Sequence, residues 1–253
     1  MSYRMFSKWI TCPRPNPDAR LRLFSLPFAG GGASVYRGWG AELSPSVEVC
    51  PVQLPGREDR YRETAFASLV GLSRALSREI APYLDRPFAI FGHSMGALLG
   101  FELARSLRHA GAPAPLALLI AAYPAPHVSL SRAPIYQLPD REFIEEMRRL
   151  QGTPTAVLEN RELMDFVLPI LRADFEACDT YLCAPEPPLD CPFFVFGGTE
   201  DHEVGEPELE RWREQTTAAF RLQMYPGTHF FVHTQRDRLL AGIGAHLATV
   251  IGP

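Results

Sequence analysis

The sequence predicts an α/β fold with a mostly parallel central sheet flanked by helices. Short apolar runs of strand length alternate with helical patterns along most of the chain. This alternation stops between residues 127 and 191 and then resumes. A length of 253 residues with 46% hydrophobic residues suits one globular domain with an insertion. We therefore expect residues 1–253 to form a single domain and residues 127–191 to form a helical insertion within it.

The first half of the chain supplies four predicted strands. Residues 116–122 are nearly all apolar, as a central parallel strand covered on both faces should be. Between the strands, apolar residues recur at helical spacing, and Gly111 can end the second of the two helices. The predicted strands cover residues 20–26, 47–54, 87–91 and 116–122, and the predicted helices cover residues 64–83 and 94–110.

The insertion contains no convincing strand pattern and two helical ones. The first helix follows Asp140, the expected N-cap residue. The second runs from residue 161 to about residue 181 and carries Pro169, which predicts a kink. Their apolar stripes are Phe143, Met147 and Leu150 in the first, and Leu163, Phe166 and Ile170 in the second. The alternation then resumes with strands 192–196 and 220–225 and helices 207–217 and 234–251.

Charge and cysteine usage exclude several classes of function. A formal net charge of −4 leaves no electrostatic footprint for binding nucleic acid or an anionic membrane. The five cysteines are odd in number and lack CxxC spacing, which argues against a disulfide framework or a zinc site. No apolar run resembles a signal peptide or reaches the roughly 18–20 residues that span a bilayer. We expect a cytoplasmic protein without a metal.

The strongest motif is Gly92-His93-Ser94-Met95-Gly96, which fits G-x-S-x-G. A predicted strand runs directly into it and a predicted helix runs directly out of it, as the nucleophile elbow of the α/β-hydrolase fold requires. There the serine sits on a strained turn, and Gly92 and Gly96 keep Cβ atoms out of the crowded backbone. The alternative is a merely structural glycine turn. We predict an α/β-hydrolase with Ser94 as nucleophile.

A serine hydroxyl needs a general base, which this fold places after the acid along the chain. His229 follows the last predicted strand, in the loop where the base belongs. His233 begins the next helix and is the main rival. His127 comes too early in the chain, and His202 adjoins the expected acid. We therefore predict that His229 is the base.

The acid is expected in the loop after the strand FFVFGG, because active sites of open α/β sheets gather at the carboxyl ends of strands. Asp201 is the preferred residue, Glu200 is the alternative, and Asp190 is a remote third choice. A solvent-exposed loop carboxylate with no role is the other interpretation of each.

The tetrahedral intermediate needs an oxyanion hole made of two backbone N–H groups. One should belong to Met95, the residue after the nucleophile. The second should come from the glycine-rich loop 27–32, where we prefer Ala29 and keep Phe28 as the alternative. A flexible turn or a phosphate-binding loop is the alternative, but no Gly-Lys-Ser/Thr follows to make it a Walker loop.

The insertion falls between the nucleophile strand and the acid strand, the position of a lid over the active site in many hydrolases. Extra helices that merely shield one end of the sheet are the alternative. We expect the lid to shape an apolar acyl pocket, with Phe28, Phe143 and Phe166 in contact with the substrate.

Five segments together resemble the type II thioesterases that accompany polyketide and nonribosomal-peptide synthases. They are LFSLPFAGGGAS, VQLPGREDRYRE, FGHSMGALLGFELAR, FGGTEDHEV and PGTHFF, and they cover nearly the whole chain in order. LPGRE is the most specific of them, although by itself it would also suit a polar turn. Two positions depart from the family pattern: His202 stands where proline is common after the acid, and Thr228 stands where glycine is common.

The resemblance implies that Ser94, Asp201 and His229 are the catalytic triad and that Ala29 and Met95 are the oxyanion donors. It also implies hydrolysis of acyl thioesters on the phosphopantetheine arm of acyl or peptidyl carrier domains. We expect a monomer that needs no cofactor of its own, because the phosphopantetheine belongs to the partner. A carboxylester hydrolase or acyltransferase with the same triad is the first alternative. A catalytically dead hydrolase fold used as a binding module is the second, and the intact triad argues against it.

Overall fold

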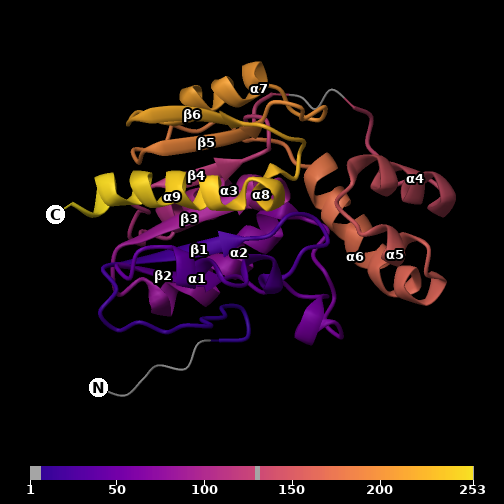
Figure 1. Ribbon diagram of the computed structural model, residues 1–253, viewed down its shortest axis with the longest axis horizontal. Helices are drawn as coiled ribbons and strands as arrows, with labels where there is room; N and C mark the ends of the chain where they lie inside the picture. Colours follow the sequence, from indigo (N-terminus) through magenta and orange to yellow (C-terminus); the bar gives the residue numbers. More distant parts are fainter. Residues whose placement is uncertain (1–6, 129–131, 253) are drawn as a thin grey trace.

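The computed structural model describes residues 7–128 and 132–252 of the chain. Its centre is a six-stranded sheet with strand order β2-β1-β3-β4-β5-β6 (Figure 1), and every neighbouring pair among these strands is parallel. The strands are β1 (Leu21–Leu26), β2 (Val47–Pro51), β3 (Phe88–His93), β4 (Leu118–Ala121), β5 (Phe193–Gly198) and β6 (Phe220–Tyr225). All six lie where the sequence predicts a strand, so the predicted α/β fold is confirmed.

Burial explains why the sequence shows apolar runs in the centre of the sheet. All residues of β1, β3, β4 and β5 are buried, because these strands are covered on both faces. By contrast, the edge strand β6 has exposed residues between its buried ends. The other edge strand, β2, is buried because an N-terminal segment lies along it, with an antiparallel bridge between Ile10 and Val52.

Helices cover both faces of the sheet, with α2 and α3 on one face and α1 and α9 on the other (Figure 1). Helices α2 and α3 also pack against each other. The α-helices outside the insertion are α1 (Trp39–Glu42), α2 (Leu69–Ile80), α3 (Met95–His109), α7 (Glu206–Glu210), α8 (Phe231–Thr234) and α9 (Arg236–Ile251). Within the described ranges, no helix is both long and apolar enough to cross a bilayer.

Some predicted helix boundaries were wrong, for local reasons. The helix predicted from residue 64 begins only at Leu69, because the Ser68 hydroxyl accepts a hydrogen bond from the Gly71 N–H and caps that end. The helix predicted over residues 207–217 is α7 followed by a 3₁₀ helix (Arg211–Gln215). The last predicted helix, over residues 234–251, is α9, which begins at Arg236, and the short α8 precedes it. The expected cap Asp140 is the first helical residue, and Pro139 is the N-cap.

The insertion contributes α4 (Asp140–Leu150), α5 (Thr155–Leu158) and α6 (Arg161–Asp179), which lie between β4 and β5 in the chain. These helices lie beside the carboxyl ends of the strands (Figure 1). They share a small apolar core of their own, separate from the main core around the sheet. Helix α6 continues through Pro169.

Candidate active site

Ser94 occupies a strained turn between β3 and α3. Its backbone has φ 53° and ψ −122°, a conformation that costs free energy for a residue with a Cβ atom. The turn is tight enough to require glycine on both sides. A Cβ at Gly92 would lie 2.0 Å from the Gly96 carbonyl oxygen, and one at Gly96 would lie 2.2 Å from the Leu26 carbonyl oxygen. The geometry is therefore that of a nucleophile elbow.

Three residues predicted to act together lie in one hydrogen-bonded chain. The His229 Nε2 atom lies 3.0 Å from the Ser94 hydroxyl, and its Nδ1 atom lies 2.8 Å from the Asp201 carboxylate. Asp201 also accepts hydrogen bonds from the backbone N–H groups of Glu203 and Val204. The Asp201 side chain is fully buried and that of His229 is 14% exposed. This arrangement can deprotonate a serine and stabilise the resulting imidazolium.

The alternatives for base and acid do not take part in this hydrogen-bonded chain. His233 stacks on Phe230, and His127 contacts Gln215 and Glu214. His202 lines the cavity beside Ser94 but comes directly after Asp201 in the chain. Glu200 is exposed, and its backbone N–H donates to Gly227. The structure therefore brings together Ser94, His229 and Asp201, and none of these rivals.

A buried histidine that the sequence analysis did not single out supports the base. His93 lies beneath the elbow, and its Nε2 atom lies 2.8 Å from the backbone carbonyl oxygen of His229. Because a carbonyl only accepts, Nε2 carries the hydrogen. Burial lowers the pKa of His93 well below its usual value, so the ring is a neutral donor. Its place in G-x-S-x-G, directly before the serine, was the only sequence signal.

The glycine-rich loop after β1 lies against the elbow and limits which N–H groups can serve as oxyanion donors. The Gly30 N–H donates to the Asp174 carboxylate and the Gly31 N–H donates to the Phe28 carbonyl, so both are already engaged. Ala29 lines the same cavity as Ser94 and Met95. The structure thus leaves the preferred donor Ala29 and its alternative Phe28 beside the nucleophile.

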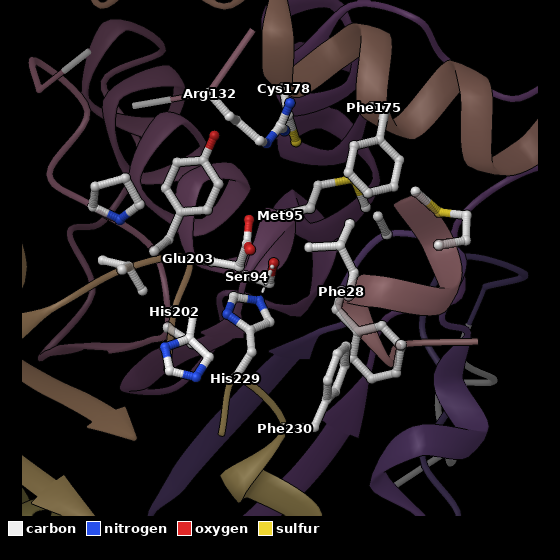
Figure 2. A pocket seen from close by; sticks show the side chains of 18 of the residues that line it. Phe28, Ser94, Met95, Arg132, Phe175, Cys178, His202, Glu203, His229 and Phe230 are labelled. Atoms are coloured by element: carbon white, nitrogen blue, oxygen red, sulfur yellow. Dashed lines mark hydrogen bonds between the residues drawn. The ribbon is translucent and has the colours of Figure 1, made fainter. Parts of the chain in front are cut away.

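A cavity of about 250 Å³ extends from Ser94 toward the insertion. Figure 2 shows Ser94 and His229 in it, with Met95, Phe28 and Phe175 nearby. Helices α4 and α6 form an apolar wall, and the loop after β5 adds polar groups. The lining residues from the insertion include Met147, Leu150, Leu171, Phe175 and Cys178. His202 and Glu203 from the loop after β5 and Glu208 from α7 also line the cavity.

Of the three expected substrate contacts, Phe28 lines this cavity, and Phe143 and Phe166 do not. Phe143 is fully buried within the core of the insertion, where its ring meets Phe175 edge-on. Phe166 is 55% exposed and packs against Tyr61 on the outside. Both assignments were wrong because an apolar stripe shows that a helix face is covered but not by what. Phe175 lies on another apolar side of α6, with Leu171 and Cys178, which the predicted contacts did not include.

The described residues contain one group with the spacing of metal ligands. Cys12, Glu48 and Cys50 have ligand atoms within 4.8 Å of one another. However, the Glu48 carboxylate already accepts hydrogen bonds from Arg22 and from the Asn16 N–H. None of the three residues lines the cavity at Ser94.

Comparison with known proteins agrees with this geometry. Residues 21–247 match the model of the thioesterase domain family. The chain is 41% identical to the gramicidin S biosynthesis protein GrsT of Aneurinibacillus migulanus, over 98% of this chain and 96% of that protein. It is 38% identical to the thioesterase PikA5 of Streptomyces venezuelae, over 96% of this chain and 87% of that protein.

Solved structures give the same result. The type II thioesterase BorB from the borrelidin biosynthetic cluster superposes with a TM-score of 0.88 at 38% identity, covering 97% of this chain and all of that one. The thioesterase RedJ from the prodiginine pathway of Streptomyces coelicolor superposes with a TM-score of 0.86 at 41% identity, covering 91% and 92%. The predicted resemblance to type II thioesterases and the α/β-hydrolase fold are confirmed. The chain belongs to the thioesterase family and is a hydrolase that acts on thioesters.

Proposed function

We propose that the protein removes acyl groups from the phosphopantetheine arm of acyl or peptidyl carrier domains, and so frees nonribosomal-peptide or polyketide synthases from stalled or aberrant intermediates. The observation that carries this proposal is the hydrogen-bonded chain of Ser94, His229 and Asp201 at one end of a largely apolar cavity. The similar proteins support the pathway, because one is named a gramicidin S biosynthesis protein and another a type II thioesterase of the borrelidin cluster.

The first half of the proposed reaction forms an acyl-enzyme. The Ser94 hydroxyl attacks the thioester carbonyl while His229 Nε2 takes its proton, and Asp201 stabilises the charged imidazole. The developing oxyanion is held by the N–H groups of Met95 and Ala29. When the intermediate collapses, the C–S bond breaks and the pantetheine thiol leaves with a proton from His229.

The second half releases the acid. A water molecule gives its proton to His229 and attacks the acyl-serine, and the same two N–H groups stabilise the second oxyanion. When this intermediate collapses, the bond between the acyl carbon and Ser94 Oγ breaks, and His229 returns the proton to Ser94 as the free acid leaves. The chemistry uses only side chains and backbone of this chain, so we propose that the enzyme needs no metal or organic cofactor. We also propose that α4, α5 and α6 are a lid that excludes bulk water from the bound acyl chain.

The proposal is tested by offering purified protein a panel of acylated carrier domains and measuring the free carrier thiol. We expect hydrolysis by the wild type and a loss of about 10⁴- to 10⁶-fold in Ser94→Ala. Oxygen esters with matched acyl groups serve as the comparison. Turnover of the esters without turnover of carrier thioesters would favour a carboxylester hydrolase, and turnover by folded Ser94→Ala would refute the mechanism.

A further inference from the structure

A buried ion pair connects the insertion to the loop that follows β2. Arg57, from the LPGRE motif, meets Asp174 of α6 with two parallel hydrogen bonds of 2.7 and 2.8 Å. The two side chains are only 4% and 1% exposed. Residues 57 and 174 are 117 positions apart in the chain, so only the folded structure brings them together.

The same two side chains also hold the glycine-rich loop at both ends of the Gly30–Gly31 pair. The Asp174 carboxylate accepts a 2.7 Å hydrogen bond from the Gly30 N–H. The Arg57 guanidinium donates a 3.1 Å hydrogen bond to the Gly31 carbonyl. Gly30 has φ +78°, and a Cβ there would lie 2.6 Å from Leu171, so α6 also packs directly against this loop. The peptide group next to Ala29 is therefore fixed by a helix of the insertion.

Stability alone is a weak reason for such a pair. Removing two charges from water costs about as much as their attraction returns, and buried pairs can often be replaced by apolar residues without loss of stability. What the pair adds is geometry. A bidentate arginine–carboxylate contact has a defined plane and direction. Here the remaining hydrogen bonds of both side chains go to the glycine-rich loop, at the Gly30 N–H and the Gly31 carbonyl.

We propose that Arg57 and Asp174 are positioning residues that aim the Ala29 N–H at the oxyanion. This inference rests on the oxyanion hole of the proposed function. Because Asp174 lies on α6, the second oxyanion donor is correctly placed only while α6 is seated against the loop. Leu171 and Phe175 of the same helix line the cavity, so one helix joins the acyl pocket to the reacting centre.

The test replaces both charges at once, which avoids leaving one buried charge without its partner. The variant is Arg57→Met/Asp174→Leu. Its matched control is Arg22→Met/Glu48→Leu, which removes another buried pair, at the amino-terminal end of the sheet. Substrates are acetyl- and octanoyl-pantetheine. Reaction with a fluorophosphonate is measured in parallel, because it also builds negative charge on oxygen in the oxyanion hole.

We expect kcat of the Arg57→Met/Asp174→Leu variant to fall roughly 10- to 100-fold with KM little changed, since the oxyanion contact forms only in the transition state. The loss should be equal for the two acyl chains, and fluorophosphonate labelling should slow by a similar factor. The control variant should keep the wild-type kcat. Arg57→Lys, which keeps the charge but not the two-pronged contact, should show a smaller loss of the same kind.

Three results would overturn the proposal: a folded double variant with wild-type kcat, a loss confined to the octanoyl substrate, or an equal loss in the control. If the double variant does not fold, wild-type kcat in Arg57→Lys would overturn it instead. Failure of the proposed function is distinguishable, because fluorophosphonate labelling reports on the reactive serine and the oxyanion hole without needing an acyl thioester. A wild type that is labelled but does not cleave carrier thioesters would refute the proposed function. The labelling rates of wild type and double variant would then still test the positioning role of Arg57 and Asp174.

Discussion

The two oxygens of the Asp201 carboxylate have different partners. Oδ1 accepts from the backbone N–H groups of Glu203 and Val204, and Oδ2 faces His229 Nδ1. The backbone therefore orients the acid, and the acid in turn selects the imidazole tautomer with hydrogen on Nδ1. Nε2 is then unprotonated and can accept the Ser94 proton.

This geometry predicts the effect of Asp201→Asn. The amide oxygen will keep the two backbone donors, so the amide NH₂ will face His229 Nδ1 and force the hydrogen onto Nε2. The base is then blocked, and we expect kcat to fall by about 10⁴ with the fold intact. Steady-state kinetics with a soluble thioester measure kcat, and a circular dichroism melt measures whether the fold is intact.

Glu200→Gln is the matched control, because it makes the same chemical change one residue away, on an exposed side chain. It should keep kcat within about twofold of the wild type, as surface substitutions usually do little. The opposite ranking of the two variants would transfer the role of acid to Glu200.

At the scale of elements, α6 is apolar on more than one side. Leu171, Phe175 and Cys178 follow one another at helical spacing and face the cavity. Phe166 and Ile170 lie on another side, in an outer groove next to Tyr61. Hydrophobic periodicity is the same on both sides. The sequence therefore led to the prediction of Phe166 as a substrate contact, whereas Phe175 lines the cavity.

The corrected assignment predicts that Phe175→Ala changes chain-length preference. Removing this ring enlarges the cavity, so kcat/KM should rise for longer acyl chains relative to shorter ones. The upper bound is about 0.8 kcal/mol, or roughly fourfold in kcat/KM, per additional buried CH₂. Competition between acyl-pantetheine thioesters of increasing length measures the shift.

Two neighbouring phenylalanines serve as controls. Phe166→Ala, outside the cavity, should keep the wild-type acyl profile. Phe143→Ala should lower the free energy of unfolding by about 3–5 kcal/mol, because it opens a void in the insertion's core. A shifted profile in Phe166→Ala with none in Phe175→Ala would contradict this assignment of the cavity wall.

At the scale of the whole molecule, a positive charge is costly on the fully buried His93 and, to a lesser degree, on His233 and His246, which are only partly shielded from water. Burial lowers the pKa of His93, His233 and His246, most strongly for His93. These groups bind protons in the unfolded chain near the ordinary histidine pKa of about 6.5 but resist protonation in the folded one. Stability should therefore decline as pH falls below about 6.5.

His93 allows this linkage to be measured. We expect the free energy of unfolding of the wild type to fall with pH between about 6.5 and 5, and His93→Gln to lower that slope by up to about 1.4 kcal/mol per pH unit. Urea unfolding at a series of pH values measures the slope. The difference in the free energy of unfolding between the two proteins at pH 8, where the histidines are neutral, reports the change in packing alone. If the free energy of unfolding depended on pH in the same way in both proteins, His93 would not be a source of this pH dependence.

Local chemistry made much of this protein predictable from its sequence. Buried parallel strands read as apolar runs because both faces are covered, and a nucleophile elbow needs glycines at set distances from its serine. His229 and Asp201 were predictable because the fold places its acid and base in loops at the carboxyl ends of late strands. These features depend on neighbours in the chain or on strand order.

Contacts between distant segments were decided only by the tertiary structure. Whether Phe143 or Phe175 faces the cavity depends on how α4 and α6 rotate against each other and against the sheet, which no single helix specifies. Likewise, Arg57 stands out in the sequence only as part of LPGRE, and nothing there pairs it with Asp174. Only folding buries the two side chains together beside Gly30. The physical reason is that a buried charge is costly without a partner. Which residue becomes that partner depends on how α6 packs against a loop 117 positions earlier in the chain.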